Sequence, residues 1–207
     1  MMIDNYNDLT IGKYQKIKEI NDAGYDESES HIHAIAVLAD MDIDEVANMN
    51  IIEFKKYNQK LEFLLGLPQK RAVATKYNLG GMELETMLAI DEMTVAQYID
   101  YQTYLKDSDK YLVELLSVFL IPKKKTYCEG YDIIEVQKAI RENLSIVDAL
   151  SLSAFFLQWY LALTKVTVTS LTKKMRKMMK REKDMEKKMV LQKAIQDLEQ
   201  NGLGFQW

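Results

Sequence analysis

The sequence predicts an all-α protein, and three observations lead to that prediction. The 207 residues include only eight Gly and two Pro, which is too few turn residues for a fold of many short strands. Apolar residues make up 48% of the chain, so it has enough apolar side chains to bury a sizeable core. Several apolar segments also follow a polar residue of the kind that caps a helix N-terminus.

The first predicted helix has a counterpart later in the chain. The stretch DLTIGKYQKI (residues 8–17) recurs in altered form as EMTVAQYIDY (residues 92–101). Thr10 and Thr94 stand at the same place in the two stretches, and each hydroxyl can accept a hydrogen bond from a first-turn amide. Gln97, three residues after Thr94, completes a capping box. Both positions are therefore predicted helix starts.

Two further helices are predicted in each half, in the same order. Apolar helices are expected at HIHAIAVLAD in the first half and at YLVELLSVFL in the second. Another capped helix follows in each half, after Asn50 and after Ser145. These helices open with two β-branched apolar residues and an acid, in the order Ile51, Ile52, Glu53 and Ile146, Val147, Asp148.

This order predicts a chain built from two similar helical units. We expect the first unit at 1–67, a connecting segment at 68–92, the second unit at 93–165, and a basic Met-rich helix with an aromatic tail at 166–207. The alternative is that common capping patterns agree by chance. The second unit carries an insertion near 121–131, which is predicted to form an irregular turn or a small hairpin and to be the only β structure.

No β structure is predicted in the connecting segment. Pro68 ends the preceding helix, and Gly80-Gly81 interrupts the chain again before the second unit.

Charge is segregated along the chain. Residues 171–193 contain ten Lys or Arg and three Asp or Glu, which gives them a net charge of +7 and leaves −11 for the remainder. Methionines follow a four-three spacing through this segment, which is typical of a coiled-coil seam, although Glu182, Gln192 and Gln196 interrupt it. The seam is expected to need a partner helix, and its methionines are Met175, Met178, Met185 and Met189.

Three surfaces are predicted to bind partner proteins: the Met seam, the lysine turn of Lys123, Lys124 and Lys125, and the aromatic residues Phe205 and Trp207 of the tail. The aromatic tail could instead pack onto the protein's own surface. The basic helix could contact a polyanion through Lys173, Lys174, Arg176, Lys177, Lys180 and Arg181. No aromatic residue lies between 171 and 193, so such binding would not read sequence; the alternative is a solvated helix that docks onto acidic surface.

No motif predicts catalysis, a cofactor or a metal. His31 and His33 are two residues apart and point about 200° apart on a helix, so they are expected to be exposed first-turn residues. Cys128 is the only thiol and could be activated by the neighbouring lysines, but no His and acid accompany it in a recognisable motif. The chain has no P-loop, dinucleotide fingerprint or nucleophile elbow, so we expect no enzyme.

Location is predicted from three features. A single cysteine fits a reducing compartment, and the segment MMIDNYNDLT lacks the order of a secretory signal. The most apolar stretch, residues 153–163, is too short to span a bilayer. We expect a soluble, intracellular protein without a membrane span.

Two segments resemble proteins of tailed bacteriophages. The first unit, with VLADMD followed by IDEVANMNIIEFKKYNQKLEFL, resembles tail assembly chaperones. The second, with LIPKKKTYCEGYDIIEV leading to LSIVDALSLSAFFLQWYLAL and its paired Phe155 and Phe156, resembles phage morphogenesis proteins. The likeness covers roughly residues 9–165 and not the basic C-terminal segment.

This resemblance implies a non-catalytic protein that binds other phage structural proteins in the tail or portal region. It would be either packaged in the virion, as in a crAss-like phage, or present in the host cytoplasm during assembly as a chaperone. It also implies a homo-oligomer or a place in a symmetric assembly. The alternative, from another class, is a sequence-nonspecific nucleic-acid-binding protein that uses the basic helix.

Overall fold

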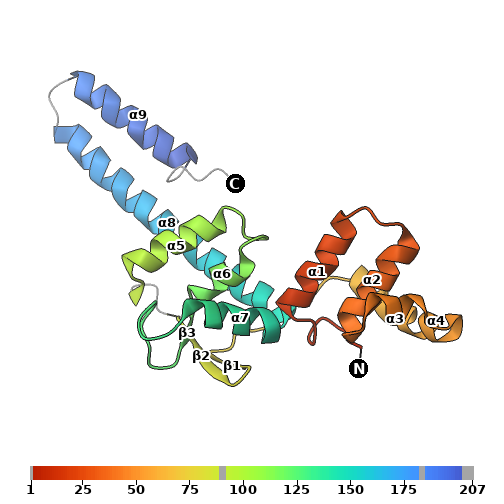
Figure 1. Cartoon of the computed structure of the whole chain (residues 1–207). Coiled ribbons are helices and arrows are strands. Elements are labelled where there is room, and N and C mark those ends of the chain that lie inside the picture. Colours follow the sequence, from red (N-terminus) through yellow and green to blue (C-terminus); the bar gives the residue numbers. More distant parts are fainter. Residues whose placement is uncertain (1, 89–91, 182–184, 202–207) are drawn as a thin grey trace. The chain divides into compact units, whose positions relative to one another are not determined.

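The computed structural model describes residues 2–88, 92–181 and 185–201 (Figure 1). The described chain is mostly helical, and it divides into two compact units, Met1–Ser153 and Ala154–Trp207. The first unit contains α1 (Ile11–Asp22), α2 (Glu27–Ala39), α3 (Ile43–Ala47), α4 (Ile51–Gln59), the 3-10 helix η1 (Lys60–Leu65), β1 (Lys76–Leu79), β2 (Met82–Thr86), α5 (Val95–Leu105), α6 (Leu112–Ser117), β3 (Leu120–Pro122) and α7 (Ile133–Asn143). Helix α8 (Ile146–Arg181) begins in the first unit, and α9 (Met185–Asn201) follows in the second.

The four helix starts predicted from capping residues are confirmed. The hydroxyl of Thr10 accepts a hydrogen bond from the N–H of Lys13 at the start of α1. Thr94 and Gln97 form the predicted capping box at the start of α5. Asn50 caps α4, and the hydroxyl of Ser145 accepts from the N–H of Asp148 in the first turn of α8. Local polar chemistry therefore determines where these helices begin.

The helix-rich fold agrees in outline with the expectation of an all-α protein, but a three-stranded antiparallel sheet is also present. Strands β1 and β2 form a hairpin in the register Lys76↔Glu85 to Leu79↔Met82, within the connecting segment, where no β structure is predicted. The reason is the turn: Gly80 and Gly81 both have positive φ, 58° and 87°, and a two-residue turn of this kind joins strands with the right twist. Gly-Gly is a hairpin signal rather than a simple break.

The predicted insertion near 121–131 contributes the third strand. Strand β3 pairs with β2 in the register Leu84↔Pro122 to Thr86↔Leu120, so the sheet order is β1-β2-β3. The insertion is thus part of a sheet to which the connecting segment supplies two strands. It is not the only β structure of the chain.

The core of the first unit is formed around α6, the sheet and the first turns of α8. Leu116, Phe119 and Leu84 are almost fully buried, and the ring of Tyr101 from α5 meets Phe119 edge-on with 5.1 Å between the centroids. Helix α1 contacts α2 on one side and α7 on the other. Within this unit, α4 and α5 lie on opposite sides of the contact between α1 and α7 (Figure 1).

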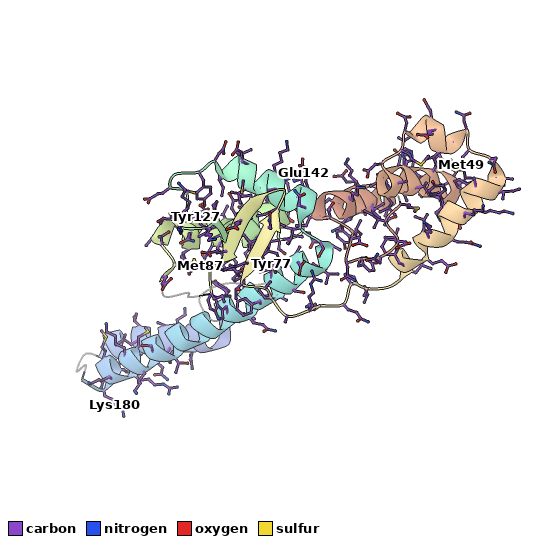
Figure 2. The ribbon with its side chains drawn as sticks, turned by 90° about the horizontal axis from the view of Figure 1, so that it is seen from below. Met49, Tyr77, Met87, Tyr127, Glu142 and Lys180 are labelled. Carbon is purple, nitrogen blue, oxygen red and sulfur yellow. The ribbon has the colours of Figure 1, made fainter. Side chains whose placement is uncertain are left out.

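In the second unit, α9 lies beside the C-terminal part of α8 (Figure 2). A single helix, α8, includes both the apolar segment that follows Ser145 and the first part of the predicted basic helix. The rings of Phe155 and Phe156 contact each other with centroids 5.3 Å apart. No described helix is long and apolar enough to cross a membrane.

Candidate interaction surfaces

The lysine turn lies next to the start of α5. Lys123 pairs with Glu83 of β2, with 2.6 Å between Nζ and Oε2; this hydrogen bond raises the pKa of Lys123 and lowers that of Glu83. Lys124 has a positive φ of 62° and Lys125 is exposed. Both line a cavity of about 410 Å³ together with Thr94. The turn therefore presents two lysines that form no salt bridge within the described part of the chain.

A buried tyrosine holds this turn against α5. The hydroxyl of Tyr127 donates to Asp100 Oδ2 over 2.8 Å. Burial, and then the hydrogen bond to Asp100, raise the pKa of Tyr127 well above its ordinary value. The next residue, Cys128, is exposed, has a positive φ of 57°, and donates its N–H to the hydroxyl of Tyr131. The turn is therefore a folded element of the first unit.

The two histidines lie elsewhere than predicted. Helix α2 begins after Asp26, so His31 and His33 fall beyond its first turn, and both are half-buried rather than exposed. The ring of His33 stacks on Tyr25 with 4.5 Å between the centroids. Within the described residues, no group of three or more His, Cys, Asp or Glu is placed to hold a metal ion.

The basic residues of α8 form one open surface. Lys173, Arg176, Lys177 and Lys180 line a cavity of about 490 Å³ with Thr169 and Thr172. Lys174 is exposed as well, whereas the side chain of Arg181 lies outside the described residues. The structure thus brings four of the six predicted polyanion contacts to a single hollow.

The predicted Met seam falls on two helices. Met175 of α8 is half-buried and Met178 is exposed, while Met189 of α9 is exposed. The side chain of Met185 lies outside the described residues, as do Phe205 and Trp207. The buried side chains here include Thr172 and Ile195, which the spacing of the methionines did not predict.

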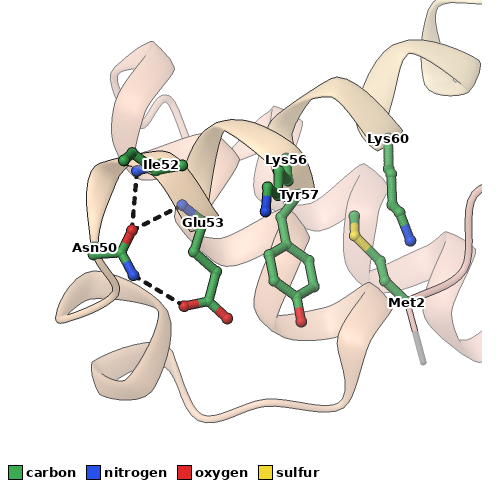
Figure 3. Close-up of a pocket in the computed structure, with 7 residues that line it drawn as sticks. All are labelled: Met2, Asn50, Ile52, Glu53, Lys56, Tyr57 and Lys60. Carbon is green, nitrogen blue, oxygen red and sulfur yellow. Dashed lines mark hydrogen bonds between the residues drawn. The ribbon is translucent and has the colours of Figure 1, made fainter.

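A groove at the start of α4 was not predicted from the sequence. It has a volume of about 560 Å³ and is lined by Met2, Asn50, Ile52, Glu53, Lys56, Tyr57 and Lys60. Figure 3 shows Asn50 at its edge, where Oδ1 accepts from the N–H of Ile52 and of Glu53 and Nδ2 donates to Glu53 Oε2. Ile51 and Ile52 are 65% and 69% exposed beside it.

A second exposed apolar surface lies on α5. Val95 is 76% exposed and Ile99 is 56% exposed, and Tyr98 lies between them on the same helix face. Helix α5 buries its other face through Tyr101 and through Gln97, whose side chain donates to the carbonyl of Val118 over 3.1 Å. Hence the helix is anchored on one side and presents apolar side chains on the other.

The start of α1 and the start of α8 meet inside the first unit. The N–H of Ile11 donates to the carbonyl of Leu144 over 3.1 Å, and the N–H of Ile146 donates to the carbonyl of Leu9 over 2.7 Å. The two caps, Thr10 and Ser145, therefore pair as an antiparallel bridge. We call this contact, made by Leu9–Ile11 and Leu144–Ile146, the closed junction.

An ion pair reinforces the closed junction. Asp148 is buried in the first turn of α8 and binds the guanidinium of Arg71 through both carboxylate oxygens. It also accepts a hydrogen bond from the hydroxyl of Ser145, and the hydroxyl of Ser151 accepts from the N–H of Arg71. The hydrogen bond to Asp148 raises the pKa of Arg71. The connecting segment is thereby tied to the start of α8.

Comparison of the chain with known proteins finds no matching family, no matching curated protein and no matching solved structure.

Proposed function

We propose that this protein is a non-catalytic structural or assembly protein of a tailed bacteriophage, which binds other virion proteins in the tail or portal region. The proposal combines the resemblance of residues 9–165 with one structural observation. Ile51, Ile52, Val95 and Ile99 are among the exposed apolar residues of the first unit, and they form two pairs on the surfaces of α4 and α5. Exposed apolar side chains that lie together on one surface, unlike single scattered ones, are typical of surfaces that bind protein.

The proposal includes the internal repeat. Residues 1–67 and 93–165 would be two versions of one helical unit, followed by the basic helix. The capped starts of α1 and α5, and of α4 and α8, support this interpretation because the capping residues occur in the same order. The protein would act in the virion or in the host cytoplasm during assembly.

Quantitative mass spectrometry of purified virions tests this function. A fixed ratio of this chain to the portal protein is expected for a packaged component. Absence from mature virions, together with abundance in infected cells, would support a chaperone that leaves the particle. Absence from both virions and assembly intermediates would contradict the proposal.

The basic surface of α8 favours a second candidate function, sequence-blind nucleic-acid binding. Four cationic side chains line one hollow there, and neutralising phosphates with such groups releases counterions. The test is the salt dependence of affinity for duplex DNA in the full chain and in a variant with Lys173, Lys177 and Lys180 all changed to Gln. The slope of log K against log salt should fall by about 0.9 for each phosphate that the variant no longer neutralises.

A matched control changes three lysines of the α4 region, Lys55, Lys56 and Lys60, to Gln. It removes the same charge from another surface of the protein. If both triple variants reduce the slope equally, binding follows net charge and the α8 surface has no special part in it.

A further inference from the structure

We infer that this chain associates with a second copy of itself, through a contact between the start of α5 in one copy and the start of α4 in the next. The inference deepens the proposed function, since it names one partner of the proposed assembly protein. Its evidence is the closed junction and two segments of the first unit that match the halves of this junction.

The closed junction joins one helix start from each half of the first unit. Ile11 opens α1 and Ile146 opens α8, and both are 0% exposed. Each donates its N–H to a carbonyl of the opposite segment. The first N–H of a helix has no partner within that helix, so the junction satisfies two such donors while it buries two isoleucines.

The matching segments are Met93–Val95 and Met49–Ile51, which we call the open halves. Met93–Val95 matches Leu9–Ile11 in sequence, with Thr94 in the place of Thr10. Met49–Ile51 matches Leu144–Ile146, with Asn50 in the place of Ser145. Each open half consists of an apolar residue, a helix cap and a β-branched residue, as in the closed junction.

The open halves have the same local structure, but no described element covers them. Val95 and Ile51 are 76% and 65% exposed, where their counterparts are fully buried. Within the described part of the chain, the N–H of Val95 and the N–H of Ile51 make no hydrogen bond. These are the donors that correspond to the two used in the closed junction.

The two open halves are placed where one chain cannot join them. Helices α4 and α5 lie on opposite sides of the contact between α1 and α7 (Figure 1). Each copy would therefore offer one open half to each of two neighbours. Such a head-to-tail contact closes into a ring or continues as a filament.

Sedimentation velocity of the full chain, over a wide range of concentration, tests this inference with two variants. Val95→Asp places a charge in the open half of α5, and Ile51→Asp places one in the open half of α4. The wild-type chain is expected to form larger species as concentration rises, and each variant alone is expected to remain monomeric. An equal mixture of the two variants should form a dimer and nothing larger, since each retains one intact half.

Ile134→Asp is the matched control, because Ile134 is 64% exposed on α7, outside both open halves, and this variant should associate like the wild type. Circular dichroism checks that all three variants stay folded. A monomeric wild type, a variant that associates normally, or a mixture that stays monomeric would each overturn the inference. Self-association without incorporation into virions would instead contradict only the phage function.

Discussion

Helices α4 and α8 begin with the same kind of cap but lie in opposite environments. Asn50 and Ser145 each accept first-turn hydrogen bonds, and each is followed by two β-branched apolar residues. At α8 these residues, Ile146 and Val147, are buried in the core, whereas at α4 they are mostly exposed. The comparison separates two determinants: a helix start depends on neighbouring residues, and burial depends on which element of the fold covers it.

The largest difference in stability between matching variants of α8 and α4 is expected for the first apolar residue of each helix. Ile146→Ala should reduce the free energy of unfolding by about 3 kcal/mol, because it leaves a cavity in a closed core. Ile51→Ala should change it by less than about 0.5 kcal/mol. Urea unfolding, at a concentration low enough to keep the chain monomeric, measures both. Similar losses for the two variants would mean that α4 is covered by another element.

A smaller difference in stability is expected between variants of the two first-turn acids, Asp148 of α8 and Glu53 of α4. Asp148→Ala should cost about 2 kcal/mol, since it removes the carboxylate that binds Arg71 and Ser145 inside the junction. Solvent screening reduces the contribution of the ion pair, because the side chain of Arg71 is half exposed. Glu53→Ala at the matching place in α4 should cost less than about 0.5 kcal/mol. The urea midpoints of the two variants test this difference in stability, and equal midpoints would contradict it.

The caps themselves are expected to behave alike. Ser145→Ala and Asn50→Ala should each cost about 1 kcal/mol, because each removes an acceptor for first-turn amides. Ser145 should be the more costly of the two, since its hydroxyl also donates to Asp148. Thermal unfolding of both variants provides the measurement. A negligible loss at Asn50 would indicate that water satisfies the first turn of α4 equally well.

An effect of the same size as that of the caps concerns how α5 is held while its start stays open. Tyr127→Phe should cost about 1 kcal/mol at neutral pH through loss of the hydrogen bond to Asp100. The pKa of Tyr127 is raised in the folded state, so its contribution is fully present below about pH 10 and is lost as the pH rises from there towards the folded pKa. Denaturation at neutral and at alkaline pH should therefore show that Tyr127→Phe loses less free energy of unfolding at alkaline pH than the wild type does.

Tyr98→Phe is the control for this pH dependence, because Tyr98 lies on the exposed face of the same helix. The free energy of unfolding that this variant loses between neutral and alkaline pH should equal that lost by the wild type. An alkaline loss unchanged by Tyr127→Phe would assign the effect to other tyrosines.

Helix starts were predictable from sequence because capping is a short-range interaction. Thr10, Asn50, Thr94 and Ser145 each bond an amide within three residues, so the pattern and the structure agree. The hairpin at β1 and β2 is also encoded locally, in alternating side chains around Gly80-Gly81, whereas the Gly-Gly pair alone predicts only a break in the chain.

The candidate surfaces were less predictable, because exposure depends on distant residues. The sequence of α4 does not reveal that Ile51 and Ile52 lack cover, since the elements that bury Ile146 and Val147 come from far along the chain. The Met spacing predicts a coiled-coil seam, yet buried Ile195 lies outside that seam. The proposed roles of Phe205 and Trp207 concern residues outside the described part of the chain.

The closed junction has a consequence for synthesis on the ribosome. It joins Leu9–Ile11, made early, to Leu144–Ile146, made late, so the start of α1 is not covered until most of the first unit has emerged. Contacts between such distant residues slow folding, because a long loop has to close first. During that delay, Leu9–Ile11 of one nascent chain could pair with Leu144–Ile146 of a neighbour on the same messenger. The rate of translation would then influence how much protein reaches its native fold.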